Sequence, residues 1–265
     1  MRRYARGQWL SVLHEGSWRD AQVASAGRSD ARHQLRLVQT TGMPAKKIAM
    51  VLHPWNHAPR DLPAGAFEAL AAWWAESMAA QHESIRDALT GRALNTLEQC
   101  VAINVTSGTL QRQVKDVRGL SDWLHEIHAK HVAGNAVSQP SAALLTAPPA
   151  AGKTTMMSQL VLLAAATRGM VPILIKVQRL QRRLLDQPDA FATAWNWVDA
   201  FLRLEYQDKP AVYCFLRQAL LARRTLLLLD GLDEGGAMRS QIERQVTEVL
   251  APQGHVILCT SRPAG

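Results

Sequence analysis

Three short polar stretches of this chain carry the residue types that bind phosphate and magnesium. The first is Gly152-Lys153-Thr154, near the end of the segment APPAAGKTT. The second is LLLLDGLDE, from Leu226 to Glu234, and the third is Thr260-Ser261-Arg262. Lysine contributes positive charge to phosphates, while a threonine hydroxyl and an aspartate can hold Mg²⁺. A further carboxylate can orient an attacking water. Together these stretches predict a site for a phosphate chain, provided that the fold brings them together.

The first stretch fits the last three fixed positions of the phosphate-loop pattern G-x-x-x-x-G-K-[ST], with Ala147 at the first position. Backbone N–H groups at the start of the following helix would surround the phosphates. Gly152 permits an unusual backbone angle, whereas Ala150 forced to positive φ would cost roughly 1 kcal/mol. The alternative is that GKT falls by chance at a helix start. The predicted cofactor-binding residues are Ala150, Ala151, Gly152, Lys153, Thr154, Thr155 and Thr260.

The second stretch begins with four leucines in a row, which is typical of a strand buried on both faces of a parallel sheet. Carboxylates at the carboxyl end of such a strand lie where open α/β folds bind ligands. An ordinary Asp-Gly surface turn is the alternative for this stretch alone. Further apolar strands are expected at Ala142–Leu145, at Val171–Val177 and in HVILCTSRP, with helices between them. The fold class predicted is therefore α/β, a phosphate-loop sheet flanked by helices over residues 138–265.

The three stretches, in this order, resemble the NACHT family of signal-transducing NTPases, which belongs to the STAND class and is related to AAA+ proteins. The resemblance covers about residues 141–265 and implies roles for the matching positions. Asp230 would hold Mg²⁺ with Thr154, and Asp233 or Glu234 would orient the attacking water. Arg262 would sense the terminal phosphate, with Thr260 beside it. The resemblance also implies a nucleotide-gated switch in which ADP holds a closed form and exchange for ATP permits oligomerisation.

The resemblance also carries expectations about the sheet edges. A complete NACHT module continues beyond the sensor strand, so the chain is expected to be a fragment or a truncated product. Without a fifth strand, the first strand would expose an apolar edge. Val171–Val177 is expected at the opposite edge, where Pro172 is tolerated.

Residues 1–62 predict a small β module. Two strands joined by a turn are expected in GQWLSVLHEGSWRDAQVASA, with two more in HQLRLV and KKIAMVL. The spacing of Trp9 and Trp18 resembles small Tudor-like barrels. Together with Trp55, these residues could form an aromatic cage for a methylated cation or, as we favour, the core of a small barrel. The module is expected to bind a protein partner.

Residues 63–137 predict a helical connector. Apolar residues at helical spacing predict a first helix: Phe67, Leu70, Trp74, Met78, Ile85 and Leu89. ALNTLEQCVAI is expected to continue as a second helix, and SDWLHEIHAKH as a third with Ser121 as its N-cap. This third helix carries His125, His128 and His131, which we expect to be exposed on the helix face. Zinc binding is disfavoured because steps of three drift around a helix and no fixed fourth ligand is nearby.

The bulk composition is that of an ordinary globular protein, with 265 residues of which 48% are hydrophobic. The net charge of +8 raises the possibility of a polyanionic partner, but basic residues are spread along the chain except in short clusters such as Arg179, Arg182 and Arg183. A solvated surface is favoured over nucleic acid or membrane. The start of the chain has no apolar signal region, and the three cysteines make no CxxC pair. A cytoplasmic location with reduced thiols is expected.

Three functions compete for this sequence. The leading one is a signalling NTPase of NACHT type that binds ATP or GTP with Mg²⁺ and hydrolyses it slowly, with oligomerisation of the full-length protein. A scaffold whose alanine-substituted loop no longer binds nucleotide is the second. The third is a phosphate-loop kinase, for which an arginine-rich lid would be required; the candidates are Arg179, Arg182, Arg183 and Arg203.

Overall fold

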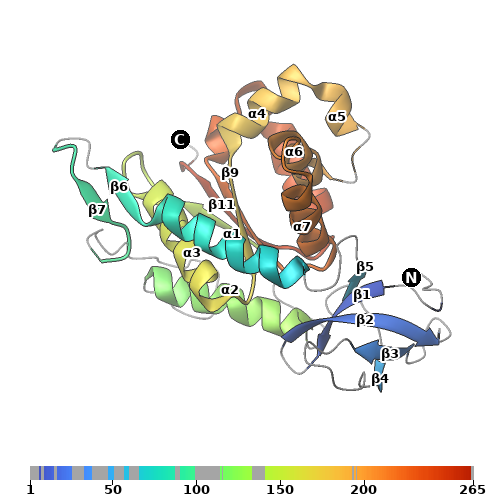
Figure 1. Ribbon diagram of the computed structural model, residues 1–265. Coiled ribbons are helices and arrows are strands. Elements are labelled where there is room, and N and C mark those ends of the chain that lie inside the picture. The colour runs from blue at the N-terminus through green and yellow to red at the C-terminus, as the bar shows by residue number, and fades with distance from the viewer. Residues whose placement is uncertain are drawn as a thin grey trace.

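The computed structural model describes residues 6, 9–14, 17–25, 33–37, 47–50, 57–59, 66–86, 90–98, 114, 116–132, 141–192, 194 and 196–263. A parallel sheet with helices on both of its faces forms the larger part, and an antiparallel sheet forms the N-terminal part (Figure 1). Trp55, Leu89 and Cys100 lie outside the described residues.

The N-terminal sheet contains five antiparallel strands: β1 (Trp9–His14), β2 (Ser17–Ser25), β3 (His33–Leu37), β4 (Lys47–Met50) and β5 (His57–Pro59). Their spatial order is β4-β3-β2-β1-β5. The four predicted strands are confirmed, whereas β5 was not predicted. Alternate residues form a small apolar core: Leu10, Val12, Ala21, Val23, Leu35 and Leu37. The choice between an aromatic cage and core packing for the tryptophans stays a prediction.

The parallel sheet contains β8 (Ala142–Thr146), β9 (Val171–Lys176), β10 (Thr225–Asp230) and β11 (Val256–Ser261), in the order β8-β11-β10-β9. Every residue of the two central strands, β10 and β11, is buried, as their uninterrupted apolar runs predict. β9 lies at one edge of the sheet, as expected from Pro172. β8 lies at the other edge, where the side chain of Leu144 is 59% exposed.

Helices cover both faces of this sheet. Figure 1 shows α3 (Lys153–Thr167) together with α1 (Ala66–His82) and α2 (Val117–Val132) on one side. On the other side lie α6 (Trp197–Glu205) and α7 (Pro210–Leu221). The remaining helices are α4 (Val177–Asp186), α5 (Pro188–Ala192), the 3₁₀ helix η1 (Leu232–Met238), α8 (Arg239–Arg244) and the π-helix η2 (Gln245–Leu250). The sheet and its helices form the α/β architecture predicted for this part of the chain.

Two helix predictions in the middle of the chain are wrong. α1 ends at His82, and Ile85 belongs to the short strand β6 (Ser84–Arg86). β6 pairs with β7 (Ala93–Asn95), so the predicted second helix does not begin there. The reason is local: the Asn95 side chain accepts hydrogen bonds from the backbone N–H groups of Leu97 and Glu98, both at 3.0 Å, and closes a turn.

α2 also differs from its prediction. It begins at Val117, and Asp116 caps it by accepting the Gly119 N–H at 2.8 Å, so Ser121 is not the N-cap. His128 and His131 are buried rather than exposed, and His128 Nε2 lies 3.1 Å from the Arg223 carbonyl oxygen. Among the described residues, no group of three His, Cys, Asp or Glu side chains could hold a metal ion.

The helices of the predicted connector pack directly on the parallel sheet. Phe67 and Trp74 from α1 and Trp123 and Leu124 from α2 belong to the same buried core as the strands. Trp74 Nε1 donates a hydrogen bond of 2.9 Å to the carbonyl of Pro172 in β9. None of the described helices combines the length and apolar character needed to cross a bilayer. The domain boundaries after residues 62 and 137 stay predictions.

Candidate functional site

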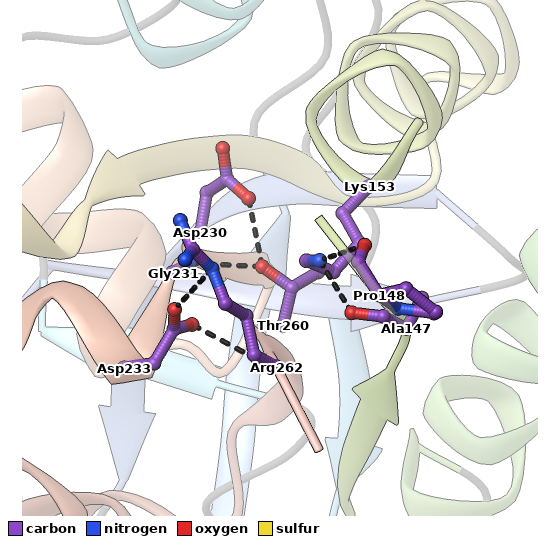
Figure 2. A network of polar contacts seen from close by, with 8 residues as sticks. All are labelled: Ala147, Pro148, Lys153, Asp230, Gly231, Asp233, Thr260 and Arg262. Carbon is purple, nitrogen blue, oxygen red and sulfur yellow. Dashed lines mark hydrogen bonds and ion pairs between the residues drawn. The ribbon is translucent and has the colours of Figure 1, made fainter. Parts of the chain in front are cut away.

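The carboxyl ends of β8, β10 and β11 meet at one edge of the sheet, beside the first turn of α3. A hollow of about 490 Å³ lies there. Figure 2 shows Lys153 from the start of α3 and the polar side chains that follow or end β10 and β11 meeting at this edge, beside Ala147 and Pro148 after β8. The residues that line the hollow are Pro149, Ala150, Ala151, Gly152, Lys153, Thr154, Thr155, Lys176, Gln178, Asp230, Gly231, Asp233, Glu234 and Arg262. The fold thus brings nearly all predicted site residues to one place; Thr260 lies directly behind them.

The loop between β8 and α3 has the backbone shape of an anion cradle. Gly152 is the N-cap of α3 with φ 82°, and it has no side chain to cap the helix. Ala150 also has a positive φ, of 60°. Met156 N donates to Gly152 O at 2.9 Å, so the N–H groups of residues 153–155 precede the helical hydrogen-bond ladder. Such N–H groups, at the positive end of a helix, fit a phosphate.

Lys153 folds back over this loop. Its Nζ donates hydrogen bonds of 2.6 Å to the carbonyl of Ala147 and 2.8 Å to the carbonyl of Pro148 (Figure 2). Both acceptors are neutral carbonyl groups, so neither of them cancels the positive charge of Lys153 at the edge of the hollow. A phosphate oxygen in the cradle would find this charge already close by.

Asp230 is the centre of a buried network at the end of β10. Thr154 Oγ1 donates to Asp230 Oδ2 at 2.9 Å, and Thr260 Oγ1 donates to Asp230 Oδ1 at 2.7 Å. Thr260 Oγ1 in turn accepts the Gly231 N–H at 2.8 Å. Asp230 is only 9% exposed, and within the described residues no cationic side chain pairs with it. A buried carboxylate next to a hydroxyl oxygen is the kind of ligand set that Mg²⁺ prefers.

The two acids after Asp230 have different surroundings. Asp233 accepts the backbone N–H of Arg262 at 3.0 Å and forms an ion pair with Arg262 Nε, also at 3.0 Å. Glu234 lies beside Gly231, whose φ is 83°; a Cβ built there would be 3.1 Å from Glu234 Cδ. The positive φ therefore favours glycine at 231, and any larger residue there would also have to displace the Glu234 side chain slightly. The Arg262–Asp233 pair ties the end of β11 to the turn after β10.

Four residues that line the hollow were not among the predicted site residues: Pro149, Lys176, Gln178 and Gly231. Lys176 and Gln178 are the two with polar side chains. Lys176 ends β9 and is opposite Asp230 in the strand register, while Gln178 lies in the first turn of α4. A polar residue directly after the apolar run VPILI was the available signal, because all strands of a parallel sheet end at the same edge. The phosphate-loop pattern does not include this strand.

Comparison with known proteins identifies no family. No family model matches the chain, and no curated protein matches it. A solved structure, "Structure of C. elegans PCH-2", is similar at 11% sequence identity and a TM-score of 0.35. The match covers 77% of this chain and 65% of that chain, so this chain spans less than two thirds of its length. A similarity at this level does not establish a shared function.

Proposed function

We propose that the hollow binds a nucleoside di- or triphosphate with Mg²⁺, and that the chain is the nucleotide-binding part of a NACHT-type signalling NTPase. The observation that carries this proposal is the hydrogen-bonded set Thr154–Asp230–Thr260 at the start of α3. It joins the phosphate loop to two strand ends that lie about 76 and 106 positions further along the chain. A chance GKT sequence would not be accompanied by these partners.

Each group in the hollow has a distinct task in this proposal. The N–H groups of residues 153–155 and the Lys153 ammonium would bind the phosphates, while Thr154 and Asp230 would hold the metal. When bound, Mg²⁺ neutralises charge on the phosphate oxygens. Asp233 and Arg262 neutralise each other across 3.0 Å. A terminal phosphate near Arg262 would compete for its guanidinium and release the Asp233 carboxylate, so that Asp233 or the neighbouring Glu234 could hold a water.

A switch with slow turnover fits this arrangement better than a fast enzyme, because Asp233 is already occupied by Arg262. The phosphate cradle is proposed to contact the phosphates, so it does not distinguish ATP from GTP. We extend the proposal to a protein partner for the N-terminal sheet, as in Tudor-like modules, and to oligomerisation of the full-length protein.

A second candidate function, an interaction scaffold that binds no nucleotide, is favoured by one observation. Ala150 has φ 60°, a conformation in which a Cβ is unfavourable by roughly 1 kcal/mol. The two functions differ in a single measurable property, nucleotide affinity.

Thermal unfolding with Mg-ATP, Mg-ADP or Mg-GTP tests the proposal. At 100 times its dissociation constant, a ligand stabilises the fold by roughly 2.7 kcal/mol, which raises the midpoint by several degrees. Lys153→Met removes the ammonium but keeps the aliphatic stem, so we expect it to abolish most of the shift. Lys209→Met, at an exposed position before α7, is the matched control and should retain the full shift.

Absence of a shift for every nucleotide, in a chain with a cooperative unfolding transition, would favour the scaffold. An equal shift in the wild type and in Lys153→Met would place the nucleotide elsewhere.

A further inference from the structure

A second, strongly basic hollow lies next to the phosphate cradle, over the exposed face of α4. Its volume is about 430 Å³, and its lining is Lys176, Gln178, Arg179, Arg182, Arg183 and Asp186. Residues 179, 182, 183 and 186 follow helical spacing and therefore share one face. The opposite face of α4 is anchored in the core by Val177, Leu180 and Leu184. We call this hollow the α4 groove.

A buried carboxylate holds two of these arginines in position. Glu205, at the end of α6, forms ion pairs with Arg179 and with Arg183 Nε, the latter at 3.0 Å. The Glu205 side chain is only 7% exposed, whereas that of Arg179 is 62% exposed. A buried acid that holds one exposed and one half-buried guanidinium group in place lowers the entropy cost of binding a ligand. The wall of the α4 groove is thus already ordered.

Positive charge remains after this pairing. The groove has four cations, and the acids that face them are Asp186 and Glu205. Among the described residues, Lys176 and Arg182 have no ion-pair partner, and the first turn of α4 contains no acid. An anion entering the groove would therefore gain favourable interactions with two free cations and with the clamped arginines.

The α4 groove is continuous with the phosphate cradle. Lys176 and Gln178 line both hollows, so the two hollows adjoin at these side chains. A ligand in the groove would lie on the side of the cradle where Asp230, opposite Lys176 in the sheet, marks the metal position. Phosphate groups are the anions that fit both the fork of arginine and this neighbourhood.

From these observations we propose that the α4 groove binds a second, phosphate-bearing small molecule, next to the phosphates of the nucleotide. Arg179, Arg182 and Arg183 contact its phosphate groups, and Lys176 bridges the two sites. This site does not depend on the cradle being functional, because the groove has its own cations and its own clamp. It supplies the chain with a way to sense a second anionic metabolite.

Calorimetric titration of the full chain with pyrophosphate tests this site. The Lys153→Met background weakens the cradle, so that the remaining binding reports the groove. In that background, we expect Arg179→Gln/Arg182→Gln to weaken pyrophosphate binding by roughly tenfold or more, since two charge-assisted contacts are lost. Arg183 stays paired with Glu205 in this variant, so the chain should still fold, which a cooperative urea transition checks. Arg118→Gln, exposed on α2 and outside both hollows, is the matched control and should bind like its parent.

Several results would overturn the site. These are the absence of pyrophosphate binding in the Lys153→Met background, unchanged affinity in the double-arginine variant, and equal weakening by Arg118→Gln. Binding of a short single-stranded RNA through the same arginines, without binding of pyrophosphate, would assign the groove to a nucleic acid instead. If pyrophosphate binds in the groove but no nucleotide shifts the thermal unfolding midpoint, the proposed nucleotide site is refuted and the proposed groove site is not.

Discussion

Ala150 and Gly152 both have a left-handed backbone in the phosphate loop, and only one of them is glycine. We expect Ala150→Gly to raise the free energy of unfolding by about 0.5–1 kcal/mol, because the strain at positive φ exceeds the entropy that glycine adds to the unfolded chain. Urea denaturation measures the change. Ala151→Gly is the control: Ala151 has no positive φ, so glycine there should lower stability.

The same substitution probes the nucleotide site. If the alanine strains the bound form of the loop, Ala150→Gly should tighten nucleotide binding up to about fivefold, the equivalent of 1 kcal/mol. A loss of stability in Ala150→Gly equal to that in Ala151→Gly would show that position 150 is not strained.

At the residue scale, the sequence identified the polar residues of the site better than the contacts between them. Asp230 and Thr260 could be predicted because each stands at the end of an apolar strand of the parallel sheet. Thr154, in the first turn of α3, could be predicted because it completes the pattern G-K-[ST]. The pairing of Asp233 with Arg262 could not be predicted, because it depends on the 3₁₀ turn that follows Gly231. A motif gives the residue types, but the geometry of the turn determines which carboxylate forms an ion pair with the arginine.

At the scale of elements, α1 protects the edge strand β9. Trp74 packs against Tyr206 with ring centroids 5.8 Å apart and donates its indole N–H to the Pro172 carbonyl. We expect Trp74→Phe to lower the free energy of unfolding by about 1–3 kcal/mol, because a buried carbonyl loses its donor and the core loses volume. Chemical denaturation measures the loss.

The neighbouring tryptophan provides the control for this prediction. Trp73 is 44% exposed in the same helix, so Trp73→Phe should change stability by less than about 0.5 kcal/mol. Similar losses in both variants would mean that helix propensity, and not the contact with β9, explains the effect.

The elements themselves were predicted unevenly. The long apolar strands and α3 follow directly from composition and from the loop before them. β6 and β7 have three residues each, too few for a period, and the turn at Asn95 replaced the expected helix. The start of α2 was missed because Asp116, which caps it, stands outside the apolar stripe used to locate the helix.

At the scale of the molecule, buried histidines make stability depend on pH. Burial lowers the pKa of His128 to about 4 and that of His255 to about 3. The fold therefore binds fewer protons than the unfolded chain below pH 6.5, and the stability present above pH 6.5 is lost as the pH falls towards 4. For His128 this loss is about 2 kcal/mol between pH 7 and pH 5.

His128→Gln keeps a donor for the Arg223 carbonyl but cannot take up the proton. We expect the loss of unfolding free energy between pH 7 and pH 5 to be smaller in this variant by about 2 kcal/mol, measured by urea denaturation at both values. His125→Gln, on the same helix but less buried, is the control. An unchanged pH dependence in His128→Gln would contradict this account.

The burial of the histidines on α2 could not be predicted from the sequence. His128 and His131 of α2 were expected on an exposed helix face, but they are buried where α2 packs against the rest of the fold, with His128 against the Arg223 carbonyl. Local patterns predict which face of a helix is polar, but they do not predict which other element lies against that face.

The strand order has a consequence for the synthesis of the chain. β8, which carries the phosphate loop at its end, pairs with β11 alone among the described strands, and the paired residues Ala142 and Ile257 are about 115 positions apart. At roughly 5–20 residues per second, a ribosome needs about 6–23 s to deliver the partner of β8 after β8 itself has emerged. During that interval β8 and the phosphate loop have no neighbouring strand to pair with. We therefore expect chaperones that bind exposed apolar strands to contact β8 before the nucleotide site is complete.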